Sequence, residues 1–120
     1  MKILIADDSM MVRRILEKFM GQMKLELVGS ATNGKEAVKM FEELKPDMVS
    51  LDITMPEMDG LNAMQKILAI NPAARIVIIS AVNSKDMIVQ ALNGGAKAYI
   101  VKPFSEAQIV QTFTEVMNAQ

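Results

Sequence analysis

Residues 48–60 read Met48-Val49-Ser50-Leu51-Asp52-Ile53-Thr54-Met55-Pro56-Glu57-Met58-Asp59-Gly60. The short, mostly apolar run that ends at Leu51 predicts a buried strand, and a loop containing Pro56 and Gly60 follows the acid Asp52. Open α/β sheets bind their ligands just beyond the carboxyl ends of their strands. The stretch therefore predicts that the Asp52 carboxylate lies where such a fold would bind a ligand.

The rest of the chain alternates between strand patterns and helix patterns. Apolar runs at residues 2–6, 25–31, 48–51, 76–79 and 99–101 predict five strands, and a segment of helical periodicity follows each of them. Runs without polar alternation are typical of parallel strands that are covered on both faces. The expected fold class is α/β, with a five-stranded parallel sheet and five helices, and residues 1–120 are expected to form a single domain.

Apolar residues at helical spacing are expected to face the core. They are Val12, Ile15, Leu16 and Phe19 in the first helix, Ala37, Val38, Phe41 and Leu44 in the second, Leu61, Met64, Ile67 and Leu68 in the third, Ile88 and Leu92 in the fourth, and Ile109, Val110, Phe113, Val116 and Met117 in the fifth.

The composition excludes several kinds of site. The chain contains no cysteine and no histidine, which rules out disulfides, thiolate catalysis, serine–histidine triads and zinc sites built from these residues. Thirteen basic and fourteen acidic side chains give a net charge of −1, so we expect no nucleic-acid partner. No apolar run approaches the roughly 18 residues that cross a bilayer. We therefore expect no membrane association and a cytoplasmic location.

Four of the five expected strands end in a polar residue that could take part in chemistry. Asp7 and Asp8 follow the first strand, Asp52 the third, Ser80 the fourth and Lys102 the fifth. The carboxyl ends of parallel strands lie along one edge of a sheet, so these side chains are expected to meet there.

Three neighbouring carboxylates repel one another unless a cation compensates them. Mg²⁺ is the natural candidate in a chain without histidine, because it prefers oxygen ligands and commonly binds carboxylates together with phosphate oxygens. With Lys102 as a fixed cation and Ser80 as a hydroxyl donor, this edge would cradle a phosphoryl group, and Asp52 would be its nucleophilic acceptor. The alternative is a carboxylate–lysine ion pair without chemistry.

The motifs at these strand ends resemble those of response-regulator receiver domains over essentially the full length of the chain. They are Asp7-Asp8, Asp52 followed by Met55-Pro56 and Asp59-Gly60, Ser80-Ala81, and Lys102-Pro103-Phe104. Within that family the chain is most similar to the single-domain receivers of chemotaxis. The resemblance implies a doubly wound, flavodoxin-like sheet of strand order 2-1-3-4-5, which periodicity alone does not provide.

The resemblance also implies the roles of the acidic residues. Asp52 would accept a phosphoryl group from a phosphohistidine on a sensor histidine kinase (CheA-like). The carboxylates of Asp7, Asp8 and Asp52 and the backbone carbonyl of Thr54 would hold the Mg²⁺ ion. The family varies at the positions of Thr54 and Val82, which can tune the rate of dephosphorylation.

Three further roles follow from the same resemblance. Ser80, which stands where threonine is frequent in the family, and Lys102 would bind the phosphoryl oxygens. Ser80 and Tyr99 would form the switch that responds to phosphorylation. The peptide bond between Lys102 and Pro103 would be cis.

Several functions remain open for such a receiver. It could diffuse freely and bind a flagellar motor switch protein (FliM-like) through its fourth helix, fifth strand and fifth helix, with a phosphatase as a further partner. It could instead act as a phosphate sink, as a phosphorelay intermediate or on a non-motor partner. It would not be an enzyme beyond its own phosphorylation and dephosphorylation.

A dehalogenase-type phosphatase is disfavoured because that family separates its two first-strand aspartates by one residue, whereas Asp7 and Asp8 are adjacent. A flavodoxin-like cofactor carrier is disfavoured because the edge is acidic.

Overall fold

The computed structural model describes residues 1–119, in which five strands alternate with five helices. In chain order the elements are β1 (Lys2–Ala6), α1 (Met10–Gln22), β2 (Glu26–Ala31), α2 (Gly34–Leu44), β3 (Met48–Leu51), α3 (Gly60–Ile70), β4 (Arg75–Ser80), α4 (Lys85–Asn93), β5 (Ala98–Val101) and α5 (Glu106–Asn118). Every strand expected from the sequence is present, and the bounds differ by at most a residue or so from the apolar runs.

All four strand pairings are parallel, and the strand order is β2-β1-β3-β4-β5. The predicted fold class and strand order are thus confirmed. The register pairs Ala6 of β1 with Leu51 of β3, and the Asp52 N–H donates to the Ala6 carbonyl over 3.0 Å. The residues that follow β1 and β3 therefore leave the sheet side by side.

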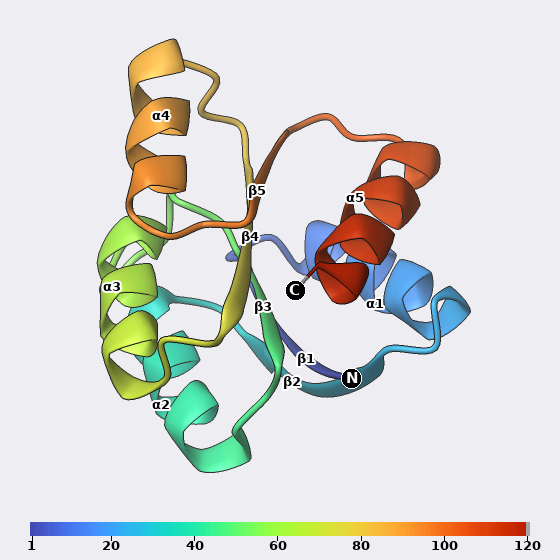
Figure 1. Cartoon of the computed structure of the whole chain (residues 1–120), viewed down its shortest axis with the longest axis horizontal. Helices are drawn as coiled ribbons and strands as arrows, with labels where there is room; N and C mark the ends of the chain where they lie inside the picture. The colour runs from blue at the N-terminus through green and yellow to red at the C-terminus, as the bar shows by residue number, and fades with distance from the viewer. Residues whose placement is uncertain (120) are drawn as a thin grey trace.

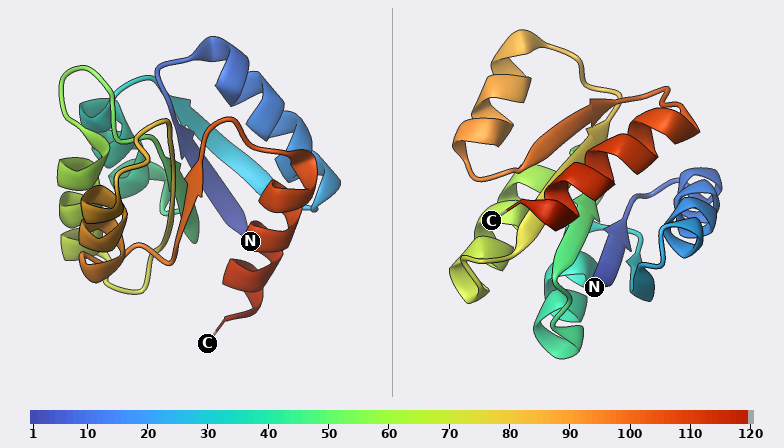
Figure 2. Two further views of the ribbon diagram at one scale, coloured as in Figure 1. Left: turned by 90° about the horizontal axis from the view of Figure 1, so that it is seen from above. Right: turned by 45° about the vertical axis from the view of Figure 1, so that its right-hand side comes forward.

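The helices form two layers around the sheet. Helices α1 and α5 cover one face, and α2, α3 and α4 cover the other (Figures 1 and 2). Strand β1 alternates between the two cores: Ile3 and Ile5 join the cluster under α1 and α5, whereas Leu4 and Ala6 join the cluster under the other three helices. Burial on both faces explains why this strand is apolar without alternation.

Most of the expected inward-facing residues are buried or half-buried, but three of them are exposed. Ile15, Leu44 and Leu92 expose 38%, 38% and 43% of their surface, so their assignment to the core is wrong. The buried residues of α1 are Leu16 and Met20, and the buried residue of α4 is Ala91. Adjacent residues of a helix point about 100° apart, so both can border a broad apolar stripe, and the sheet beneath the helix decides which of them is buried.

Each helix begins at a capping side chain that follows a strand end. The five caps are Ser9, Asn33, Asp59, Ser84 and Ser105, and each accepts a backbone N–H from the first turn of its helix. Asp59 therefore stabilises the start of α3. Within residues 1–119, no helix combines the length and the apolarity that crossing a membrane requires.

Candidate functional site

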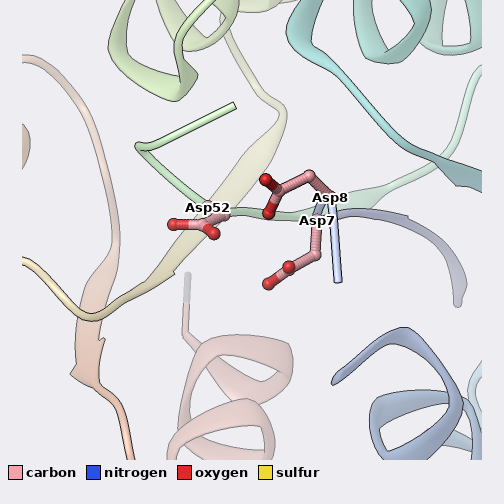
Figure 3. A group of neighbouring side chains, drawn as sticks. All are labelled: Asp7, Asp8 and Asp52. Atoms are coloured by element: carbon pink, nitrogen blue, oxygen red, sulfur yellow. The ribbon is translucent and has the colours of Figure 1, made fainter. Parts of the chain in front are cut away.

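An acidic cluster lies at the carboxyl edge of the sheet. Asp7 and Asp8 come from the end of β1 and Asp52 from the end of β3, and their carboxylates point into one space (Figure 3). One oxygen of each lies within 4.8 Å of the others. Asp7 and Asp52 are almost fully buried, at 2% and 5% exposure, whereas Asp8 is exposed. The parallel register of β1 and β3 brings these acids together.

Lys102, directly after β5, bridges the two buried acids. Its Nζ atom donates to Asp7 Oδ2 over 2.8 Å and to Asp52 Oδ2 over 3.1 Å, and these are the ion pairs found among residues 1–119. Burial disfavours the charged ammonium, but the hydrogen bonds to Asp7 and Asp52 outweigh it and raise the pKa of Lys102. The side chain therefore remains a cation at neutral pH. The peptide bond that joins it to Pro103 is cis.

The Asp7 carboxylate is held in an unfavourable electrostatic environment. Burial raises the pKa of Asp7, and the nearby Asp52 carboxylate raises it further. The hydrogen bonds from Lys102 and from the Ser9 N–H, which lies 2.9 Å from Asp7 Oδ1, oppose this increase without cancelling it. The cluster therefore favours the uptake of a positive charge. Three clustered carboxylates are a donor set of hard oxygens that fits Mg²⁺.

This environment predicts the effect of Asp7→Asn on metal-free protein. The raised pKa means that the folded state binds the Asp7 proton more tightly than the unfolded state does, so ionised Asp7 destabilises the fold above that pKa. We expect Asp7→Asn to be more stable than the wild type at pH 7, and the difference to shrink as the pH falls toward the ordinary aspartate pKa of about 3.9. Urea unfolding with a chelator present measures the stability difference at pH 7 and its change with pH.

The control for this series is Asp86→Asn, which removes a carboxylate from an exposed position on α4. We expect it to produce no comparable stabilisation, because its carboxylate is already solvated and lies at the favourable end of a helix dipole. An Asp7→Asn variant that is less stable than the wild type at every pH would contradict the electrostatic explanation.

Ser80 and Tyr99 meet at the backbone of Val82. Ser80 is fully buried at the end of β4, the strand next to the one that carries Asp52, and its Oγ atom accepts the Val82 N–H over 3.1 Å. The Tyr99 hydroxyl donates to the Val82 carbonyl over 2.5 Å. Burial raises the pKa of Tyr99, so its hydroxyl keeps its proton at neutral pH. The two residues predicted to form a switch thus hold the loop between β4 and α4 at one residue.

The loop after β3 folds tightly behind Asp52. The Thr54 N–H donates to Asp52 Oδ1 over 3.3 Å, so the structure places Thr54 beside the acid through its backbone. The Gly60 N–H donates to the Ile53 carbonyl over 2.8 Å. A Cβ atom on Gly60 would lie 2.0 Å from the Asp52 carbonyl oxygen, which leaves no room for a side chain.

Sequence reasoning missed two contacts in this region: the backbone contacts of Val82, which the family resemblance named only as a variable position, and the contact that Arg13 makes. The contact that Val82 makes is a backbone contact, and nothing in its side chain indicates it. Arg13 donates from Nη1 to the Asp7 carbonyl over 2.8 Å, and it is not among the residues that helical periodicity assigns to the core. The one signal that could have pointed to Arg13 is its position in the first turns of the helix that follows the two acids.

Comparisons with known proteins agree with this geometry. The response regulator receiver domain family matches residues 3–114. The chemotaxis protein CheY of Thermotoga maritima is 43% identical over 115 residues, covering 96% of each chain. The CheY of Listeria monocytogenes is 45% identical over 111 residues, covering 92% of this chain and 93% of the relative.

The fold is also similar to a solved structure. A chain of the CheX–CheY–BeF₃–Mg²⁺ complex of Borrelia burgdorferi superposes with a TM-score of 0.95 at 32% identity, covering 98% of this chain and 90% of the other. The sheet order, the acidic cluster and the match over residues 3–114 lead to one conclusion. This chain belongs to the family of response regulator receiver domains.

Proposed function

We propose that the protein is the phosphoacceptor of a two-component system and that Asp52 is the residue that receives the phosphoryl group. The observation that carries this proposal is the position of Lys102, which donates to both Asp7 and Asp52 within a cluster of three carboxylates. A cation fixed beside a buried carboxylate can stabilise the negative charge of an incoming phosphoryl group.

The chemical step is a displacement at phosphorus. An oxygen of the Asp52 carboxylate attacks, the bond from phosphorus to the donor breaks, and the donor leaves as a histidine imidazole of a kinase or as acetate from acetyl phosphate. Lys102 stabilises the transferred oxygens. Ser80 accepts the Val82 N–H with its oxygen, and its hydroxyl hydrogen would donate to a phosphoryl oxygen.

Mg²⁺ would be held by the three carboxylates of the cluster and by the backbone carbonyl of Thr54. When bound, the ion neutralises the carboxylates and attracts the phosphoryl oxygens. The buried Asp7 supports this assignment, because burial raises its pKa and the hydrogen bonds from Lys102 and Ser9 do not cancel that increase, so a cation bound there would stabilise the carboxylate.

Acetyl phosphate tests the proposal without a kinase. We expect incubation with Mg²⁺ to attach one phosphoryl group per chain, and peptide mapping after reduction of the acyl phosphate to place it on Asp52. Omitting Mg²⁺ or adding a chelator should abolish the modification. Labelling at a different residue, or the absence of labelling in the presence of Mg²⁺, would overturn the proposal.

The switch would operate through the Ser80–Val82–Tyr99 contacts. A phosphoryl group that draws the Ser80 hydroxyl toward Asp52 changes the environment of the Val82 peptide, to which Tyr99 is bonded. The signal would leave through α4, β5 and α5, where the apolar residues Val89 and Leu92 of α4 expose 45% and 43% of their surface. Driving such an equilibrium from 1:99 to 99:1 requires about 5.5 kcal/mol of differential interaction.

Tyr99→Phe tests this connection. The variant removes the hydroxyl that donates to the Val82 carbonyl but keeps the ring, so we expect a loss of stability of about 0.5–1.5 kcal/mol. We also expect beryllofluoride to perturb the α4 amides less than in the wild type, as measured by NMR chemical shifts with Mg²⁺ present. Wild-type shift changes throughout α4 would show that the hydroxyl plays no part in the switch.

The proposed physiological role is chemotaxis in the cytoplasm. A CheA-like sensor histidine kinase would be the donor, a FliM-like motor switch protein the target, and a phosphatase a further partner. This role is supported by the similarity to CheY proteins over nearly their whole length and by a similar structure that contains CheX together with CheY.

Binding to a motor switch peptide separates this role from its alternatives. We expect beryllofluoride with Mg²⁺ to strengthen the binding. Unchanged binding would instead support a phosphate sink, a phosphorelay intermediate or a receiver that acts on a non-motor partner.

A further inference from the structure

The junction between β1 and α1 is closed by Arg13, for which no ion pair with a carboxylate is found among residues 1–119. Arg13 Nη1 donates over 2.8 Å to the backbone carbonyl of Asp7, and its side chain is partly buried. The same junction is held by two further bonds: the Ser9 N–H donates to the Asp7 carboxylate, and the Arg13 N–H donates to the Ser9 carbonyl over 3.0 Å. These three bonds link the strand end to the first turns of the helix.

The carbonyl that Arg13 holds belongs to the peptide unit between Asp7 and Asp8. The orientation of this unit sets the direction in which the Asp8 side chain leaves the backbone. The position of the Asp7 carboxylate does not depend on this peptide unit alone, because Lys102 and the Ser9 N–H hold that carboxylate directly. Among residues 1–119, no hydrogen bond or ion pair is found for the Asp8 carboxylate, which nevertheless points into the acidic cluster (Figure 3).

We propose that Arg13 is a positioning residue that holds Asp8 for the metal ion by fixing the Asp7–Asp8 peptide. This inference rests on the proposed Mg²⁺ site and adds to it a residue that touches neither the ion nor the phosphoryl group. Residues that orient metal ligands from outside the coordination sphere typically contribute about 10–100-fold in affinity.

A purely electrostatic effect of Arg13 would change the Mg²⁺ affinity in the opposite direction. A guanidinium near a divalent cation repels it, so if Arg13 acted only through its charge, removing that charge would strengthen Mg²⁺ binding. We expect positioning to prevail, because the guanidinium hydrogen bond is short and partly buried, whereas a charge near the surface is screened by salt. The direction of the change in affinity therefore distinguishes the two roles.

The experiment titrates Mg²⁺ into metal-free protein by calorimetry at fixed ionic strength. Arg13→Gln should raise the dissociation constant for Mg²⁺ by about tenfold. Arg13→Lys, which keeps a charged donor on a flexible stem, should give an intermediate value. Arg14→Gln is the matched control, because it removes the same charge from the next residue, which is exposed; it should change the constant less than about twofold.

The outcomes separate the inference from the function on which it rests. Wild-type protein that binds no Mg²⁺, or an Asp8→Ala variant with wild-type affinity, would overturn the proposed metal site itself. Wild-type binding together with unchanged or tighter binding by Arg13→Gln would overturn only the role of Arg13. If Arg13→Gln fails to fold, Arg13→Lys decides: a shifted Asp8 amide resonance in the metal-free protein with weakened Mg²⁺ binding supports positioning, and wild-type values for both overturn it.

Discussion

Asp52→Asn is expected to lose phosphorylation by acetyl phosphate by at least about 100-fold, because the amide that replaces the carboxylate is a poor nucleophile. The substitution keeps the size of the side chain, and its single oxygen can still accept one of the two hydrogen bonds that Asp52 receives on separate oxygens, from the Thr54 N–H at Oδ1 and from the Lys102 ammonium at Oδ2. The lost labelling would therefore report on chemistry. Radiolabelled acetyl phosphate, or the mass increase of one phosphoryl group, measures it.

Two controls accompany this variant. Asp59→Asn changes the other aspartate of the same loop, whose side chain caps α3 outside the acidic cluster, so its labelling should stay close to the wild-type level. A denaturant titration confirms that Asp52→Asn is folded. Undiminished labelling of a folded Asp52→Asn protein would show that another residue is the acceptor.

Gly60→Ala is expected to destabilise the protein by about 3 kcal/mol and to slow phosphorylation in the fraction that remains folded. The added Cβ atom would lie 2.0 Å from the Asp52 carbonyl oxygen and 2.9 Å from the Ile53 Cα atom. Both are backbone atoms, so no side-chain rotation can relieve the overlap. Either α3 or the strand end that carries Asp52 must move. Urea unfolding measures the first effect, and the rate of labelling by acetyl phosphate measures the second.

Gly21→Ala provides the matched control, because a Cβ atom on Gly21 would meet nothing within 4 Å and the residue lies within α1. There, alanine should be neutral or stabilising by up to about 1 kcal/mol. Gly34→Ala offers a second crowded position, since its Cβ atom would lie 2.0 Å from the Met58 carbonyl oxygen in the same loop. Equal stability of the Gly60 and Gly21 variants would contradict the steric explanation.

The layout of the fold could be predicted from the sequence because its signals are local. An apolar run such as residues 76–79 has few soluble alternatives to a strand covered on both faces. The strand order could not be predicted from local signals, because the pairing of β1 with β3 joins segments that are distant in the chain. The order was predicted only through the resemblance to a known family. Ile15, Leu44 and Leu92 were expected in the core but are exposed, which shows that local periodicity does not by itself decide which side of a helix is buried.

The candidate site divides in the same way. Its charged members could be named from the sequence, because Asp7, Asp8, Asp52 and Lys102 each follow a strand and parallel strands end at one edge. The contacts that support these charged residues could not be predicted from the sequence. The Arg13 guanidinium and the Tyr99 hydroxyl both donate to backbone carbonyls, which every residue carries and no residue type reveals.

By itself, then, the sequence determined the elements, the fold class and the acids, the hydroxyl and the cation at the strand ends, because hydrophobic periodicity and residue type act over a few neighbouring positions. Only the tertiary structure decided which helix faces are buried and which backbone groups hold the acids in place. These depend on the packing of segments distant in the chain, such as α1 and α5, whose buried residues share one hydrophobic cluster.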